Sequence, residues 1–304
     1  MKLFFKLSLI SAFSTSCYTL ALQSDYSAVA EVGLTNNSDL AIKELDVISS
    51  QSDSGNTLSL ALSSNIKFSD TFKITPSYRY EKVNYQTLDQ YDLTLHQYGV
   101  DSNVKRGNTD FGIRYDGATA KVANETFLRL NQASLYAGHF ISATTYIRAS
   151  LNTASKTFLT QPARDSNNVG VNSSLYYFMN QGNTLLLIGA KIEKEQAEDS
   201  QYDFKGYGIN TKLSHKFTAL NLSNEAGIGW SYNNKDYHET NPASFTEPTL
   251  SRDEKRNVFN AFWQLNVIDS ISIVAEAEYG DYSSKTSSNT YTQSVTSLSL
   301  KAEF

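Results

Sequence analysis

Acid–base chemistry in this chain of 304 residues would depend on four histidines, which are scattered over separate segments: His96, His139, His215 and His238. Only His238 has acidic residues on both sides, Asp236 and Glu239. A hydrolase needs a nucleophile and a base within hydrogen-bond reach of each other, and no nucleophile motif accompanies these histidines. The sequence therefore predicts that the protein is not an enzyme and has no catalytic residues. A hydrolase with its site in the loop that contains His238 is the least favoured alternative.

Metal and cofactor chemistry lacks a donor set with suitable spacing. Cys17 is the single cysteine, and the carboxylates near His238 do not have the spacing of a calcium-binding loop. The glycines within 206–229 open no helix, so they do not predict a phosphate-binding loop. We predict no metal site and no cofactor.

A larger set of charged residues recurs at alternate positions of strand-like segments. Inside a membrane barrel their side chains would face water, where fixed charges sort small solutes by charge. The same charges could neutralise one another as ion pairs, and both interpretations can hold together. The predicted pore-lining residues are Glu31, Lys67, Lys73, Arg79, Glu81, Arg114, Arg148, Lys212, Glu225, Glu276 and Glu278.

The elements that would position these charges are strands, because apolar and polar residues alternate with period two along the whole chain. In one clear segment Ile271, Ile273 and Tyr279 share one face, and Glu276 and Glu278 share the other. We expect about fourteen strands, with twelve or sixteen as alternatives. They lie near 25–35, 57–68, 71–82, 91–105, 109–117, 127–138, 143–153, 167–179, 184–193, 203–217, 220–232, 256–267, 271–281 and 291–304.

The connections between these segments alternate in length. Tight turns are predicted at Ser69-Asp70, 106–108, 180–183, Thr218-Ala219 and Asp269-Ser270, and long loops between the other pairs, among them 36–56, 153–167 and 233–255. A soluble β-sandwich has no reason to keep long connections at one end, whereas a membrane barrel has short turns on one rim and long loops on the other. The fold class is therefore all-β, a single up-and-down antiparallel transmembrane β-barrel.

Aromatic side chains are expected to form two interfacial girdles. The short-turn girdle would contain Phe68, Phe72, Phe111, Phe178, Phe217 and Phe304. The loop-rim girdle would contain Tyr80, Tyr115, Trp230, Tyr232 and Tyr279.

Composition agrees with a barrel rather than a helical membrane protein. Hydrophobic residues make up 40% of the chain, its mean hydropathy is −0.38, and its longest apolar run, 185–190, is far shorter than the roughly 20 residues of a membrane helix. The formal net charge of −5 argues against nucleic acid as a partner.

Residues 1–21 have the organisation of a signal peptide. Lys2 and Lys6 form its positive end, 7–20 its mainly apolar stretch, and Thr19-Leu20-Ala21 a cleavage site. Lipidation at Cys17 is the alternative. We expect the barrel to occupy 22–304 and to contain no disulfide, since no other cysteine is present.

The last strand, 294–304, carries Leu298, Leu300 and Phe304 on one face. It resembles the terminal strand of Gram-negative outer-membrane β-barrels, including porins. That resemblance implies export to the bacterial outer membrane and recognition of these three residues by the barrel-assembly machinery.

A looser likeness covers much of the chain. The segments YRYEKVNYQTLDQYD, ETFLRLNQASLYAG, AGIGWSYNNKDY and AEYGDYSS are similar to the barrels of surface lipoprotein assembly modifiers. The tetratricopeptide repeats of that family have no counterpart before the first strand near Asp25. The likeness implies an alternative function, assembly or export of a surface lipoprotein or polysaccharide with a periplasmic partner.

The favoured prediction is a porin-like passive channel for small hydrophilic solutes, because the inner face is polar. Outer-membrane lipid and lipopolysaccharide are the other expected partners.

Overall fold

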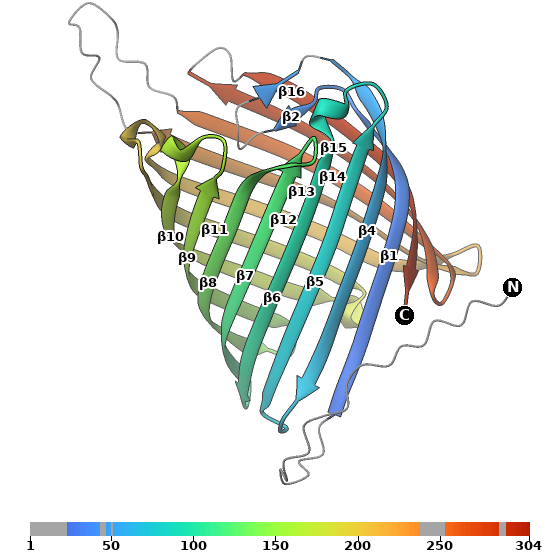
Figure 1. Cartoon of the computed structure of the whole chain (residues 1–304). Coiled ribbons are helices and arrows are strands. Elements are labelled where there is room, and N and C mark those ends of the chain that lie inside the picture. Colours follow the sequence, from blue (N-terminus) through green and yellow to red (C-terminus); the bar gives the residue numbers. More distant parts are fainter. Residues whose placement is uncertain (1–22, 43–46, 50, 238–252, 286–289) are drawn as a thin grey trace, which may run out of the picture.

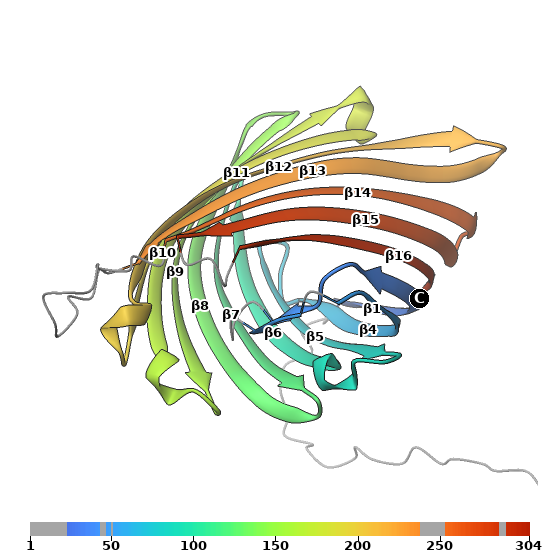
Figure 2. The same cartoon turned by 90° about the horizontal axis from the view of Figure 1, so that it is seen from above.

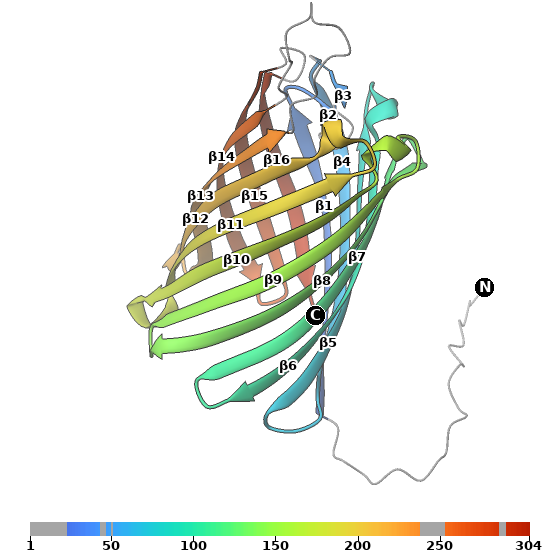
Figure 3. The same ribbon diagram turned by 90° about the vertical axis from the view of Figure 1, so that its left-hand side faces the viewer.

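Fourteen long strands close into one barrel (Figure 1). The computed structural model describes residues 23–42, 47–49, 51–237, 253–285 and 290–304. The barrel strands are β1 (Gln23–Asn37), β4 (Asp53–Lys67), β5 (Phe72–Tyr85), β6 (Leu93–Arg106), β7 (Thr109–Val122), β8 (Glu125–Ser142), β9 (Thr145–Phe158), β10 (Ser166–Met179), β11 (Thr184–Ala197), β12 (Phe204–Ala219), β13 (Leu222–Tyr237), β14 (Glu254–Ile268), β15 (Ile271–Ser284) and β16 (Tyr291–Glu303). A short hairpin of β2 (Ala41–Ile42) and β3 (Val47–Ile48) lies at the loop rim (Figures 1 and 3).

Every barrel strand pairs antiparallel with its neighbour in the chain, and β1 closes the ring against β16. The closing edge is held at the chain end by two reciprocal backbone hydrogen bonds of 2.9 Å between Ala28 and Phe304. Closure gives each strand a partner on both sides, which is necessary where lipid offers no hydrogen bonds. The predicted fold class and the count of fourteen strands are confirmed.

One predicted tight turn is displaced by two residues. Thr218 and Ala219 still pair with β13, and the turn is made by Leu220 and Asn221, whose φ angles are 55° and 61°. Two successive residues with positive φ suit the twist of a tight hairpin. The prediction placed the turn where the apolar pattern ended, while the strand pairing continued to Ala219.

The loop rim contains a turn that was predicted to be a long loop. Strands β7 and β8 are joined by Ala123 and Asn124 alone, with φ angles of 49° and 66°. The other loop-rim connections are longer, for example 159–165 between β9 and β10. The alternation of loop length therefore holds with this exception.

Several strands extend further toward the loop rim than predicted. β9 ends at Phe158 rather than 153, β11 at Ala197 rather than 193, and β13 at Tyr237 rather than 232. Beyond the lipid-facing band both faces of a strand are polar, so the alternation that marks a strand disappears although backbone pairing continues. These extensions enlarge the polar wall at the loop rim.

The outer surface carries an apolar band. Large side chains such as Leu62, Leu151 and Ile192 are more than half exposed, as expected for residues that contact lipid. Phe178 is different. It lies two residues from Tyr176 on β10, so both side chains are on the same face of the strand, and both line a cavity on the inner wall. Its predicted place in the outer girdle is wrong.

Some predictions fall outside the described residues. They are the signal peptide at 1–21 with Cys17, and His238 with most of the 233–255 loop. Within the described ranges, no helix is long and apolar enough to cross a membrane.

Candidate functional site

The cross-strand register places the eleven predicted pore-lining residues on the polar face, opposite the apolar band. In the strand register Lys67 of β4 lies directly opposite Lys73 of β5, and Glu31 of β1 lies opposite Lys301 of β16. The next residue along β1 from Glu31 is the outward Val32, 52% exposed. Figure 2 shows the interior that this face encloses. A role of these charges in conduction stays a prediction.

Ion pairs on this face follow the wall. Arg79 Nε lies 2.6 Å from Glu81 Oε1, and Arg114 Nε lies 2.7 Å from Asp116 Oδ2. In both pairs the residues are two apart on one strand, the spacing that puts side chains on one face. Both pairs are at least 30% exposed, so each adds little to stability. Each of these two pairs neutralises charge within one strand and does not connect opposite walls of the barrel.

A cavity of about 770 Å³ opens on the inner wall from β4 to β10. We call it the tyrosine cavity. Among its lining residues are Lys73, Asp101, Asn103, Lys105, Asp110, Arg114, Tyr136, Phe140, Tyr146, Arg148, Tyr176 and Phe178.

Tyrosine hydroxyls satisfy the carboxylates of this cavity. Tyr136 donates to Asp101 Oδ1 at 2.7 Å and accepts from Asn103 Nδ2 at 3.0 Å. Tyr146 donates to Asp110 Oδ1 at 2.9 Å. Hydrogen bonds to ionised acceptors are stronger than neutral ones, so these bonds hold the two rings in fixed positions.

Glycines make room for the same rings. A Cβ at Gly112 would lie 2.2 Å from Tyr136 Cζ, and one at Gly138 would lie 1.9 Å from the Tyr146 hydroxyl. Each ring therefore lies against bare backbone, a known way to cover glycine in a strand. The guanidinium carbon of Arg148 lies 3.6 Å from the Tyr136 ring centroid, within the range of a cation–π contact.

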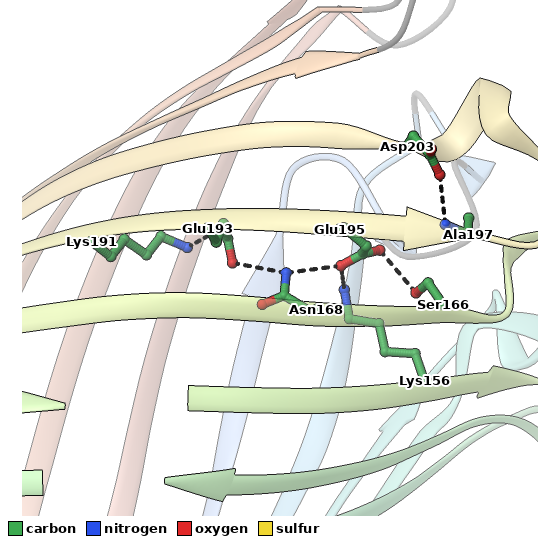
Figure 4. A network of polar contacts seen from close by, with 8 residues as sticks. All are labelled: Lys156, Ser166, Asn168, Lys191, Glu193, Glu195, Ala197 and Asp203. Atoms are coloured by element: carbon green, nitrogen blue, oxygen red, sulfur yellow. Dashed lines mark hydrogen bonds and ion pairs between the residues drawn. The ribbon is translucent and has the colours of Figure 1, made fainter. Parts of the chain in front are cut away.

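A second polar group, the loop-rim cluster, lies on β9 to β11 (Figure 4). Glu195 accepts from Lys156 Nζ at 2.5 Å and from Ser166 Oγ at 3.1 Å. Asn168 Nδ2 lies 3.3 Å from Glu195 and 3.4 Å from Glu193, which in turn pairs with Lys191 at 3.0 Å. The side chain of Glu195 is only 9% exposed, so its partners replace most of its water.

The cluster continues onto the neighbouring strands. Lys235 Nζ lies 4.4 Å from the Phe204 ring centroid, and Arg256 pairs with Glu254 at 3.2 Å. Lys235 and Arg256 line a cavity of about 220 Å³ together with Lys156 and Glu195. The loop-rim wall thus contains charges of both signs in close contact.

The sequence-based prediction included Lys73, Arg114 and Arg148 of the tyrosine cavity but none of the residues of the loop-rim cluster. Lys191 and Glu193 lie inside the strand predicted at 184–193 and were not singled out, and Glu195 lies beyond its predicted end. Tyr136 and Tyr146 were missed because an aromatic ring on the polar face of a strand has no simple pattern. Only the register shows that they meet Asp101 and Asp110.

An acidic arc lies opposite β9, the strand of Arg148 and Tyr146. Glu31, Glu276 and Glu278 lie on β1 and β15, on either side of β16. In the ring order β16 lies seven strands from β9, halfway around fourteen. Ser299 and Ser297 hydrogen-bond to Glu31 and Glu276. Lys301 lies opposite Glu31 in the strand register but forms its ion pair with Glu303, and within the described ranges none of the three glutamates forms an ion pair.

The proposed assembly residues lie on the outer face. Leu298 is 55% exposed, Leu300 50% and Phe304 78%. Phe304 is fixed through its backbone to Ala28, which leaves its ring at the short-turn rim. Recognition by assembly machinery stays a prediction.

Phe304→Ala tests that prediction. We expect the variant to refold in detergent like the wild type, because the ring is exposed, but to reach the outer membrane of cells in several-fold lower amount. Quantitative immunoblots of membrane fractions measure this. Leu220→Ala removes another exposed side chain, 92% exposed in a short turn, and serves as the control. Equal amounts of all three proteins would contradict the role of Phe304.

Comparison with known proteins supports the fold. No protein-family model and no curated protein matches the chain. The in-vitro folded outer-membrane protein OmpT of Vibrio cholerae is similar in structure, with 9% identity, a TM-score of 0.57, and 97% of this chain and all of that chain covered. Its loop L8 deletion mutant has a TM-score of 0.58 at 10% identity over 93% of this chain and all of that one. The anion-selective porin from Comamonas acidovorans has a TM-score of 0.54 at 8% identity, again over 93% and 100%.

These likenesses show the fold of bacterial outer-membrane β-barrels. They also correct the exclusion of an enzyme. That prediction is wrong as a conclusion: the OmpT structures share the fold at 9–11% identity, and such a fold is compatible with a rim activity as well as with a channel.

Proposed function

We propose that the protein is a porin-like passive channel for small hydrophilic solutes. The single observation that supports this most directly is the continuous polar inner face, on which charged side chains line the tyrosine cavity and the loop-rim cavity. Barrels larger than eight strands have an interior too wide to be filled by side chains. A polar wall around that interior favours a water-filled path.

The distribution of charge also supports a channel. In the tyrosine cavity the cations Lys73, Lys105, Arg114 and Arg148 outnumber Asp101 and Asp110. In the acidic arc the three glutamates outnumber Lys301 of β16. Charges of opposite sign on facing walls orient and sort solutes as they pass.

Planar-bilayer recording of the refolded protein tests the proposal. We expect discrete current steps in symmetric potassium chloride, because water and ions would occupy the polar interior. The control is protein taken through the same refolding after Gly33→Val, a change that places side-chain atoms against Leu298 O, already 2.7 Å from a Cβ at this position, and so blocks closure of the barrel. An absence of steps above the lipid background for the wild type would overturn the proposal.

A further inference from the structure

We infer that the tyrosine cavity binds solutes that combine a carboxylate with a six-membered ring. This inference rests on the proposed channel function and names the class of solute that the channel would select. It rests on three features of the cavity: a cation that forms no ion pair within the described residues, carboxylates that already accept hydrogen bonds, and an aromatic surface beside these charged groups.

Arg148 supplies the cation. Its guanidinium stacks on Tyr136, and within the described residues no carboxylate forms an ion pair with it. Stacking leaves the edges of the guanidinium plane, where its N–H donors lie, available to a ligand. A planar fork of donors matches a carboxylate in a two-bond arrangement.

The surrounding charges favour an anion. Lys73 and Lys105 line the same cavity as Arg148. The two carboxylates beside them, Asp101 and Asp110, accept hydrogen bonds from tyrosine hydroxyls. A neutral donor does not cancel the charge of a carboxylate, but it occupies part of its hydrogen-bonding capacity. The cations of the lining, which include Arg114 in its pair with Asp116, outnumber these two acids.

The aromatic surface would hold the ring. Phe140 and Tyr146 have ring centroids 4.8 Å apart at 50°, and Tyr146 and Tyr176 have centroids 5.7 Å apart at 57°. Successive tilted rings form a curved wall that can contact the ring of a solute by its face or edge. Because Arg148 belongs to the same strand as Tyr146, two residues away, charge and ring contacts lie within one small solute's reach.

Equilibrium binding to the refolded wild type tests the class of solute. Isothermal titration with benzoate, galacturonate, acetate and benzyl alcohol separates the two contributions. We expect at least one ring acid to bind about 10-fold more tightly than acetate or benzyl alcohol, since it alone uses both contacts. Preference for benzoate identifies an aromatic ring, and preference for galacturonate a sugar ring. Equal affinities for acetate and both ring acids would overturn the inference.

Variants assign the binding to this cavity. We expect Arg148→Gln to weaken the ring acid about 10-fold or more, because a charged two-bond contact is lost, and Tyr176→Leu to reduce the preference over acetate. Lys212→Gln is the matched control: Lys212 also stacks on a lumen ring, Phe262, at 4.7 Å, but on another wall. Unchanged binding in Arg148→Gln, or equal weakening in Lys212→Gln, would contradict the assignment. Circular dichroism and gel mobility establish that each variant is folded.

The channel and the site fail separately. Current steps without preferential binding of a ring acid overturn the site and leave the channel. An absence of current steps overturns the channel whatever the titration gives. If only the binding site is correct, the affinity of Arg148→Lys for the ring acid should lie between those of the wild type and Arg148→Gln, because lysine keeps the charge.

Discussion

Glu195→Gln is expected to lower the free energy of unfolding by about 3 kcal/mol, as breaking a buried ion pair does when it leaves a charge without its partner. The side chain of Glu195 is 9% exposed and that of Lys156 27%. With the carboxylate gone, Lys156 would lose its nearest anion while remaining largely out of water. Urea unfolding of the refolded barrel, followed by gel mobility, measures the loss.

The exposed pair of Arg79 and Glu81 gives the matched control. Both side chains are more than a third exposed, 50% and 37%, so Glu81→Gln should change the free energy of unfolding by at most about 1 kcal/mol. The double variant Lys156→Met with Glu195→Gln should recover part of the loss, because no charge is then left without a partner. Equal losses in Glu195→Gln and Glu81→Gln would show that burial does not set the strength of these pairs.

Gly112→Ala is expected to destabilise the barrel by about 1–3 kcal/mol, the range for forcing extra atoms into a packed site. The new Cβ would meet two ring carbons and the hydroxyl oxygen of Tyr136 at 2.2–2.5 Å. The ring must then move away from Asp101 and Asn103, and the stack with Arg148 would be lost with it. Intrinsic fluorescence of the two tryptophans follows unfolding.

Gly206→Ala provides the comparison on another inner wall. There the nearest atoms to a Cβ are in the flexible side chain of Glu193, at 3.1 Å and 3.2 Å, which can move aside. We expect a change of at most about 1 kcal/mol. If both alanines are equally tolerated, Tyr136 is not held in place against Gly112.

Period-two alternation determined the architecture of this protein. In the segment that forms β15, Ile273 and Tyr279 lie on one face, and Glu276 and Glu278 lie on the other. Such alternation predicts the apolar and the water-facing side of a strand without reference to the strands beside it. All fourteen strands could be predicted in this way, because the lipid-facing band demands apolar residues at every second position.

The ends of strands and two of the turns could not be predicted so well. Outside the lipid band, residues on both faces contact water, so Glu195 and Lys235 carry no sign that they still belong to a strand. Backbone pairing extends them all the same. The turn at Leu220 was misplaced for a related reason, since pairing rather than hydropathy decides where the chain reverses.

The sequence by itself determined which charged residues share the polar face, because the face of a strand residue depends only on counting by two. Tertiary structure alone decided which of them meet. The contacts of Tyr136 with Asp101, and of Lys156 with Glu195, join strands that are not neighbours in the chain. They depend on the register of the strands and on rings that lie over Gly112 and Gly138. These contacts cannot be predicted from a local sequence pattern, because the side chains that form them meet only when the barrel closes.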